Sequence, residues 1–470
     1  MEREFTNKSW EYVVKKIDIL SKRKSYVTRF RMDYYLFVFG KASRIDYLKG
    51  FINNVIGFLS QIRYIFICQL SKSKKIDPGL KYIVHLSDSN SFLKTILPVC
   101  EMLLEHKCEP IFLCPANHYS RLMARLGRET TSRLFRYEQV QIHRNKVKAF
   151  LNLLRAFALS FLDTIWFIFQ PVKRSFSTSL SFGRHSFVHH YSDRFWMKYF
   201  NTDKKIFVAA EDQYLWEVAL FDNIHVTQSL SYVFQHGKLS DAYYPTAAKQ
   251  FCTYGIIDFN KMIKEFKASP SEILDIGSPC FDKIYNHYHD NPVTANHEHL
   301  CITFFAQPFY RVVATSTANY LSALDWFYEL SANKRLNNYK FILKLHPHDL
   351  PSFYSSRPPN IEIAHDNLLS LIEKSLFTLT VDSSSIFEAT FCRVPSIQTI
   401  PPGDLFSDES YSGISMKATT YSELEKLAFR LLEDKDFYQQ SIERSKEALH
   451  LYFSNLGHSL DNIKELLSVN

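Results

Sequence analysis

"FILKLHPHDL" at 341–350 and "FTLTVDSSSIFEATFCRVPSI" at 377–397 decide the fold. Each stretch begins as a short apolar segment, typical of a buried strand, and then changes abruptly to polar residues. The first runs into His346 and its polar neighbours, and the second into Asp382 and three serines. Because the carboxyl ends of parallel strands meet at one edge of a sheet, the two polar clusters predict one binding site at that edge.

Short apolar segments alternate with amphipathic helical segments on both sides of these stretches. In a first series the predicted strands are 81–86, 109–115, 140–144, 205–210 and 231–237, and in a second they are 300–308, 339–347, 360–366, 376–382 and 394–400. Strands of this kind, separated by helices, belong to parallel sheets covered on both faces. The sequence therefore predicts an α/β protein with two doubly wound, Rossmann-type domains and a cleft between them.

Four segments follow from this order. Residues 1–75 are a basic amphipathic segment, 76–285 a first Rossmann-like domain, and 286–420 a second one that holds the nucleotide. The polar, histidine-rich run 285–299 is read as the linker, in preference to a metal site, because no second ligand set accompanies it. Thr420 and Glu423 form a capping box that opens a long terminal helix within 421–470, predicted to cross back over the cleft.

Composition excludes several kinds of site. A chain of 470 residues with 46% hydrophobic residues is large enough for two cores. It has 12 glycines and neither a G-x-G-x-x-G nor a P-loop stretch, so any phosphate must be held by hydroxyls, histidine or helix termini. No C-x-x-C pair occurs among the eight cysteines, and "MEREFTNKSW" lacks a signal peptide's apolar region. These features predict a cytoplasmic protein without metal or cofactor.

Basic residues are concentrated at the N-terminus. Residues 1–75 carry 16 Lys or Arg against 6 Asp or Glu, while the whole chain is only +8. A basic, aromatic and amphipathic composition suits a helix on an anionic membrane surface, and equally a solvated face over ordinary core helices. Both interpretations stand for 1–75, whereas 150–170 is predicted to be a core helix. No nucleic-acid-binding signature is present.

The second series supplies a candidate phosphate site. Ser383, Ser384 and Ser385 fall where a helix should begin, so they are either a phosphate site or a plain N-cap. Glu388, one turn later, could accept the two hydroxyls of a ribose or simply compensate the helix dipole.

Residues after the two preceding strands extend the candidate site. His346, pinned in an extended conformation by the following proline, is placed to donate to a phosphate oxygen, although a structural role remains open. Lys344 adds positive charge. Gln307 and Arg311 follow the strand at 300–308 and are predicted to contact base or phosphate at the same edge.

The first series supplies candidate catalytic groups. Glu211 and Asp212 follow the strand at 205–210, and His236 ends the strand at 231–237. A carboxylate or an imidazole near neutrality can act as a general base, and a carboxylate can act as a nucleophile. Adjacent carboxylates at a solvated helix start are the plainer interpretation of Glu211 and Asp212.

The order of short motifs over about 205–450 resembles a family. "FQHG", "TYG", "IGSPCFD", "KLHP" and "SSSIFEATFCRVPSI" follow one another as in GT-B glycosyltransferases of bacterial capsule and surface polysaccharides. The nearest are the Kdo transferases, the polysialyltransferases and the CDP-glycerol glycerophosphotransferases. The resemblance implies that His346 and the serines hold the phosphate of a cytidine nucleotide and that His236 lies near the reacting centre. Two departures stand out: Gln213 follows Asp212 where a glycine is usual, and Arg393 precedes Val-Pro where a glycine is usual.

The preferred function is therefore that of a metal-independent GT-B glycosyltransferase. It would move a sugar from a CMP- or CDP-type donor to a lipid-linked saccharide, at the inner face of a bacterial membrane. Two alternatives are a non-catalytic subunit that binds nucleotide sugar or polysaccharide, and a UDP-sugar 2-epimerase of the same fold.

Overall fold

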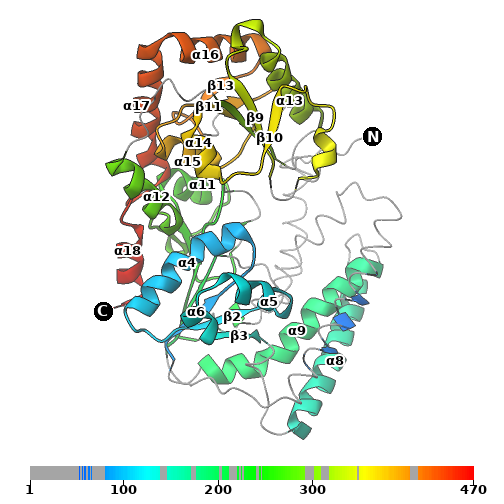
Figure 1. Ribbon diagram of the computed structural model, residues 1–470. Helices are drawn as coiled ribbons and strands as arrows, with labels where there is room; N and C mark the ends of the chain where they lie inside the picture. The colour runs from blue at the N-terminus through cyan, green and yellow to red at the C-terminus, as the bar shows by residue number, and fades with distance from the viewer. Residues whose placement is uncertain are drawn as a thin grey trace. The chain divides into compact units, whose positions relative to one another are not determined.

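Most of the chain after residue 79 is described by the computed structural model. The described residues are 80–469 without the gaps 138–145, 171–175, 201–203, 211–219, 222–223, 225–226, 240–242, 245, 292–300, 308–316, 347–348 and 403–410, and before residue 80 only positions 52, 55, 56, 58, 59, 62, 63 and 65. Two compact units can be separated, each with its own sheet (Figure 1). The N-terminal unit comprises Asn7–Cys280 and His458–Asn470, and the C-terminal unit comprises Phe281–Gly457.

The N-terminal sheet contains seven strands among the described residues, and each pairing is parallel. Across the sheet they lie in the order β3 (Leu134–Arg136), β2 (Ile111–Cys114), β1 (Tyr82–His85), β4 (Ile206–Ala209), β5 (Leu230–Phe234), β6 (Gln250–Thr253) and β7 (Ile273–Asp275). The winding direction reverses between β1 and β4, which is the switch point of a doubly wound sheet.

Core residues of this sheet alternate between its two faces. Ile83 and Phe207 belong to one buried cluster, while Val84 and Val208 belong to the other. Since successive side chains of a strand point to opposite faces, a strand buried on both faces must be apolar throughout. Within the described residues, the main helices of the unit are α4 (Asn90–Glu105), α5 (Ala116–Arg125), α6 (Arg128–Ser132), α8 (Lys146–Ile168), α9 (Phe176–Phe200), α11 (Ile256–Lys264) and α18 (Ser459–Leu466).

The C-terminal sheet has six strands among the described residues, again all parallel. Their order is β10 (Ile361–Ala364), β9 (Lys340–Lys344), β8 (Cys301–Phe305), β11 (Ser375–Thr380), β12 (Ser396–Thr399) and β13 (Met416–Ala418). Numbered within the unit, this is the Rossmann order 3-2-1-4-5-6, with the switch point between β8 and β11. The predicted pair of doubly wound α/β units is confirmed.

Helices cover this sheet as well. They are α12 (Pro279–Asp290), which begins two residues before the unit, α13 (Thr317–Ser331), α14 (Leu368–Glu373), α15 (Ser385–Phe391), α16 (Tyr421–Glu433) and α17 (Lys435–Tyr452). The main core cluster joins Phe304, Leu343 and Leu379 of the strands to Phe327 of α13 and Leu424 of α16.

Four details differ from the sequence predictions. The terminal helix is broken at Asp434, which takes an extended conformation and caps α17 by accepting from the Phe437 N–H at 2.9 Å. The linker predicted from residue 285 begins later, because α12 continues to Asp290 and packs Tyr288 into the core. A short strand that the sequence did not predict, β3, pairs with β2, whereas the strand predicted at 140–144 lies outside the described residues and stays a prediction.

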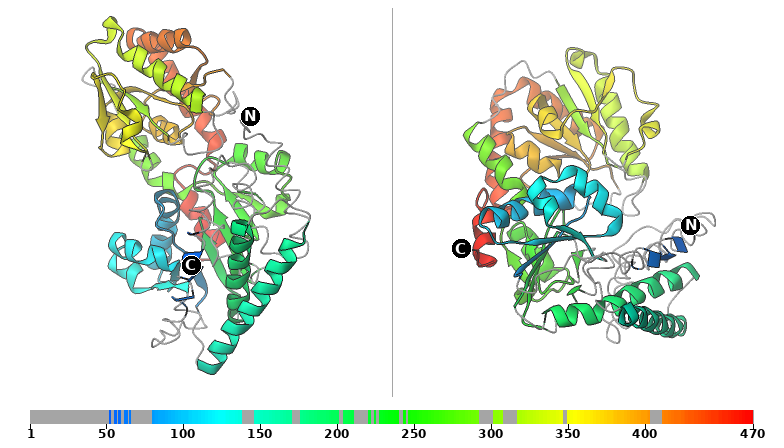
Figure 2. Two further views of the ribbon diagram at one scale, coloured as in Figure 1. Left: turned by 90° about the vertical axis from the view of Figure 1, so that its right-hand side faces the viewer. Right: turned by 60° about the horizontal axis from the view of Figure 1, so that its bottom comes forward.

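The fourth difference concerns α8, the segment predicted as a core helix. Only 28% of its apolar stretch Val147–Ile168 is buried, so α8 is a surface helix. Of the helices that the structure describes, it is the one that is long and apolar enough to cross a membrane by length and composition. Figure 2 shows α8 and α9 side by side along their length.

Candidate functional site

At the switch point of the C-terminal sheet, a hydrogen bond joins the two loops that flank it. Gln307 follows β8, and its Oε1 accepts from the Asp382 N–H after β11 at 2.9 Å. Thr380 reinforces the junction, because its hydroxyl donates to the Phe305 carbonyl at 3.1 Å and accepts from the Ser383 N–H at 3.3 Å. The predicted residues Gln307 and Ser383 therefore do lie at one edge of the sheet.

A buried chain of hydrogen bonds ties the loop after β9 to the same place. The Gln307 N–H donates to the Tyr320 hydroxyl at 3.2 Å, and this hydroxyl lies 2.9 Å from that of Tyr354. Burial, and to a smaller extent the nearby Asp349 carboxylate, raises the pKa of the Tyr354 hydroxyl. Asp349 Oδ2 accepts from the His346 N–H at 2.8 Å, which fixes the turn that carries the imidazole.

Burial strengthens this chain. Both tyrosine rings are fully buried, which raises the pKa of Tyr320 and of Tyr354 far above the ordinary value. Both hydroxyls are therefore protonated at any working pH and can donate. Polar chains in a low-dielectric interior polarise one another, so each bond supports the next. His346 itself is exposed at the end of this rigid support.

The three serines have unequal positions. Ser383 Oγ accepts from the Ser385 N–H at 3.2 Å and lies 2.9 Å from Ser385 Oγ, so this pair caps the start of α15. Ser384 is exposed and makes no side-chain capping bond. Of the predicted serines, Ser384 is thus the one that presents its hydroxyl outward.

The remaining predicted donor residues lie in different surroundings. Glu388 is buried in the first turn of α15, at 5% exposure. Lys344 ends β9 and donates to the Asp366 carbonyl at 2.7 Å, which holds the loop after β10. Arg311 lies outside the described residues.

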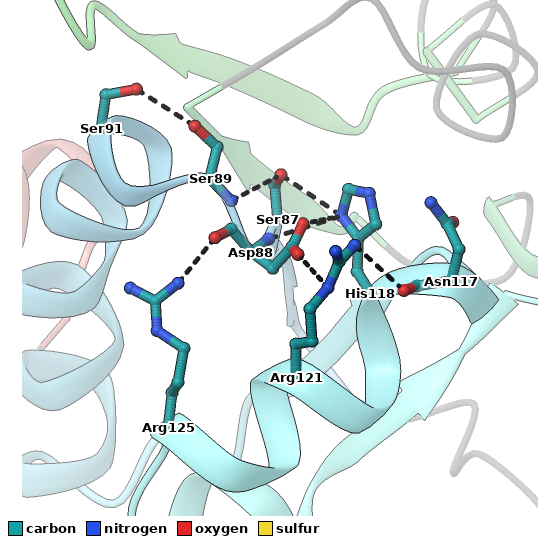
Figure 3. Close-up of polar contacts among 8 residues, drawn as sticks. All are labelled: Ser87, Asp88, Ser89, Ser91, Asn117, His118, Arg121 and Arg125. Carbon is teal, nitrogen blue, oxygen red and sulfur yellow. Dashed lines mark hydrogen bonds and ion pairs between the residues drawn. The ribbon is translucent and has the colours of Figure 1, made fainter. Parts of the chain in front are cut away.

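At the N-terminal unit's switch point, a polar cluster follows β1 (Figure 3). Asp88 lies at its centre: one carboxylate oxygen is 2.9 Å from His118 Nδ1, and the other forms an ion pair with Arg121. Arg125 donates to the Asp88 carbonyl at 2.6 Å and to the Asn90 side chain at 2.7 Å. Two arginines of α5 are thus fastened to the loop between β1 and α4.

The charged groups of this cluster surround the buried imidazole of His118. His118 is 6% exposed, and its burial lowers its pKa against the opposing effect of the Asp88 carboxylate. Below it His85 is fully buried, with Nδ1 2.8 Å from the Tyr137 hydroxyl, and burial lowers its pKa to about 3. Both histidines are neutral near pH 7, so the charge of the cluster comes from the Asp88 carboxylate and the two arginines.

His236 has a defined tautomer. Its Nδ1 lies 2.6 Å from the Ala210 carbonyl, and because a carbonyl only accepts, Nδ1 carries the proton. The lone pair of the neutral ring is then on Nε2. Phe92 of α4 contacts the ring edge-on at 4.1 Å between centroids, and Tyr243 contacts it at 4.9 Å.

The turn around His236 is held by the residue before it. Gln235 is 1% exposed, donates to the Gly237 carbonyl at 2.8 Å and to Asp258 Oδ2 at 2.6 Å, and accepts from the Tyr254 N–H. Burial raises the pKa of Asp258 to about 6, although Gln235 and two lysines oppose the change. Glu211 and Asp212, which follow Ala210 directly, lie outside the described residues.

The Asp88 cluster was missed by the sequence analysis. Its signal was available: "SDSN" at 87–90 follows a buried strand, as the polar residues after β9 and β11 do. A histidine and an arginine one turn apart, His118 and Arg121, begin the helix after the next strand. Among the described residues, no group of three or more His, Cys, Asp or Glu could hold a metal ion.

Comparison with known proteins finds similarity in fold. No family model matches the chain, and a search of curated proteins finds no match. A protein described as a UDP-N-acetylglucosamine 2-epimerase from Listeria monocytogenes matches with a TM-score of 0.50 and 11% identity, over 83% of this chain and 96% of that chain. The chain has a GT-B-like fold.

Two further structures have lower scores. A UDP-GlcNAc 2-epimerase from Neisseria meningitidis bound to UDP-GlcNAc has a TM-score of 0.49 and 10% identity, over 84% of this chain and all of its own. A glycosyltransferase from Rickettsia africae has a TM-score of 0.44 and 12% identity, over 83% of this chain and all of its own. Similarity at such low identity does not assign an activity.

Proposed function

We propose that the protein is a glycosyltransferase that moves a sugar from a nucleotide donor, of the CMP or CDP type, to a lipid-linked saccharide at the inner face of the membrane. One observation carries the proposal. Both sheets of the GT-B-like fold reverse their winding, and polar side chains follow the strands at both reversals: Gln307 and Asp382 in one unit, Asp88 in the other. Ligands of open α/β sheets bind at this position.

The C-terminal unit would take the donor. His346 is exposed at the end of a rigid hydrogen-bonded turn and donates to a phosphate oxygen, and the outward hydroxyl of Ser384 provides a second donor. Gln307 keeps the loops after β8 and β11 together, which preorganises the Ser384 contact, and Asp349 holds the turn that carries His346. Stabilising the leaving phosphate is the largest contribution such a site can make to the rate.

The N-terminal unit would take the acceptor and hold the base. Nε2 of His236, which carries the lone pair, accepts the proton of the acceptor hydroxyl, unless Glu211 or Asp212 does so. The acceptor oxygen forms a bond to the anomeric carbon while the bond from that carbon to the phosphate oxygen breaks. The electron pair leaves with the nucleotide, whose new charge His346 stabilises.

A second candidate is a UDP-sugar 2-epimerase, favoured by the similarity in fold to the Listeria protein. This enzyme would use the same nucleotide site but would return the sugar to its nucleotide. A third, a non-catalytic subunit, would bind nucleotide sugar without turnover.

Purified protein incubated with CMP-, CDP- and UDP-activated sugars, with and without membrane lipid extract, tests the proposal. Release of nucleotide that depends on the extract supports glycosyl transfer. Inversion at C2 of a sugar still attached to UDP identifies the epimerase, and binding without either reaction identifies the non-catalytic subunit. His365→Ala, an exposed histidine after β10, is the matched control for His346→Ala.

A further inference from the structure

The helix hairpin of α8 and α9 is polar on its inside. Asn152 of α8 donates to the Tyr191 carbonyl of α9 at 2.9 Å, and Ser160 donates to the Gly183 carbonyl at 2.8 Å, both in buried surroundings. The buried carboxylate of Asp163 lies 2.6 Å from Ser186 Oγ and 2.8 Å from His190 Nε2. The polar residues of α8 are therefore used to bind α9.

The opposite face of α8 is apolar and exposed. Eight large apolar side chains, each between 39% and 78% exposed, recur at spacings of one, three, six or seven residues, which place them on one side of a helix: Val147, Phe150, Leu151, Leu154, Phe161, Leu162, Ile168 and Phe169. We call them the α8 outer face. At 1.5 Å per residue it is about 33 Å long, and contiguous apolar surface of this extent marks an interaction site.

The arrangement favours a helix that lies in a membrane surface over one that crosses the membrane. α9 packs Phe187, Tyr191 and Trp196 into the core of the N-terminal sheet. Because α8 is hydrogen-bonded to α9, its inner face cannot be turned toward lipid without breaking these buried bonds. Only the outer face is available, and a helix with one apolar face binds parallel to the bilayer.

Charge around the helix selects the lipid. Lys148 is exposed in the first turn of α8, and Arg144 and Lys146 precede it in the sequence, while Lys173 and Arg174 follow the helix. The one acidic residue of 144–174 is Asp163, which is buried. Basic residues at both ends of an apolar face match the headgroups of anionic lipids. They also disfavour pairing with a second copy, since parallel and antiparallel pairs would both bring like charges together.

We propose that the α8 outer face binds anionic lipid bilayers and holds the N-terminal unit against the membrane. This goes beyond the proposed function, because the surface binds lipid whether or not the chain transfers sugar. It concerns a different segment from the membrane role predicted for residues 1–75, of which Phe58 packs against Phe157 of α8.

Vesicle flotation of the full chain without nucleotide tests this, so a failed transferase assay would leave the result intact. Phosphatidylcholine vesicles with and without phosphatidylglycerol are compared for the parent and for the variant Leu151→Gln/Leu154→Gln/Phe161→Gln/Leu162→Gln. The lipid partition coefficient of the variant should fall by about a hundredfold or more, since four apolar side chains no longer enter the lipid. Lys148→Gln should weaken binding about fivefold on anionic vesicles and leave it unchanged on neutral ones.

Two control variants distinguish lipid binding by this face from general surface hydrophobicity and from unfolding. Leu321→Gln/Leu451→Gln replaces exposed leucines elsewhere and should bind vesicles like the parent. If circular dichroism shows that the quadruple variant is unfolded, the single variant Phe161→Asp takes its place. Unchanged vesicle binding by a folded outer-face variant would overturn the proposal. So would light scattering that finds a dimeric parent and a monomeric variant with equal affinity for lipid.

Discussion

Tyr354→Phe should damage the C-terminal unit more than the loss of one hydroxyl usually does. The change removes the buried hydrogen bond between the Tyr320 and Tyr354 hydroxyls, beside the Asp349 carboxylate that holds the His346 turn. Both rings are fully buried, so no water can replace the missing oxygen. The phenyl ring fills the same space, and the effect therefore measures the hydrogen bonds alone.

The magnitude follows from the bond that is lost and from the hydroxyl that stays behind. A neutral hydrogen bond contributes about 1 kcal/mol, and a buried polar group that loses its partner costs about 1–3 kcal/mol. Removing the contact between Tyr354 and the buried Tyr320 hydroxyl should therefore lower the free energy of unfolding by about 3 kcal/mol. Tyr438→Phe is the matched control in the same unit, because the Tyr438 hydroxyl makes one neutral bond, to the Leu376 carbonyl at 3.1 Å. Tyr438→Phe should lower the free energy of unfolding by about 1 kcal/mol.

Hydrogen exchange read on peptides that cover β8 and β9 measures the stability of this unit alone. Donor affinity, measured by calorimetry on the same variants, should fall for Tyr354→Phe and stay unchanged for Tyr438→Phe. His346→Ala should lose about 1.5–3 kcal/mol of donor affinity with little change in exchange. The reasoning is refuted if Tyr354→Phe and Tyr438→Phe lower the free energy of unfolding equally. It is also refuted if Tyr354→Phe leaves donor affinity unchanged.

Three further changes test other parts of the structure. At least one of Glu211→Gln, Asp212→Asn and His236→Ala should lower turnover about a hundredfold while donor binding persists, as loss of a general base does; three fully active variants would remove these residues as candidates. Since burial raises the pKa of Asp258 to about 6 from 3.8, the folded state keeps a proton that the unfolded state releases, and this contribution is lost as pH rises from about 4 to about 6. Relative to Asp258→Asn, the parent should lose about 2 kcal/mol of stability over this range in guanidinium denaturation, and equal pH profiles would contradict the burial of that carboxyl. Arg393, which follows α15 at φ 59°, occupies the left-handed position that glycine favours. Arg393→Gly should therefore raise stability by about 1 kcal/mol, and a lower melting temperature would show that the arginine side chain is needed.

The strands next to the candidate site could be predicted because they are buried on both faces. β8, β9 and β11 are short, largely apolar runs that end abruptly in polar residues, a pattern typical of central strands in a parallel sheet. The capping residue Thr420 was predicted as well, and its hydroxyl accepts from the Glu423 N–H at 3.2 Å. The reciprocal bond differs, since the Glu423 carboxylate accepts from Thr419 instead of Thr420.

Features that depend on partners distant in sequence could not be predicted. β7 and β13 have three residues each, too few to show a period, and pairing with β6 and β12 defines them. The bonds between Asp88, His118 and Arg121 join residues about thirty positions apart. The sequence also does not show which side of α8 is exposed, because only the contacts with α9 decide which face is buried.

The return of α18 to the N-terminal unit has a consequence for biosynthesis. Ile463 and Leu467 fill the core cluster against α4, the Tyr82 hydroxyl donates to the Leu467 carbonyl at 3.1 Å, and Ser459 Oγ accepts from the Ser278 N–H at 2.9 Å. On the ribosome, residues 80–280 emerge first, yet this side of their core stays open while the whole of 281–457 is made. The C-terminal unit, which is continuous, can close earlier. We expect the half that is translated first to reach its native state last, with its apolar α4 surface in need of chaperone protection until α18 emerges.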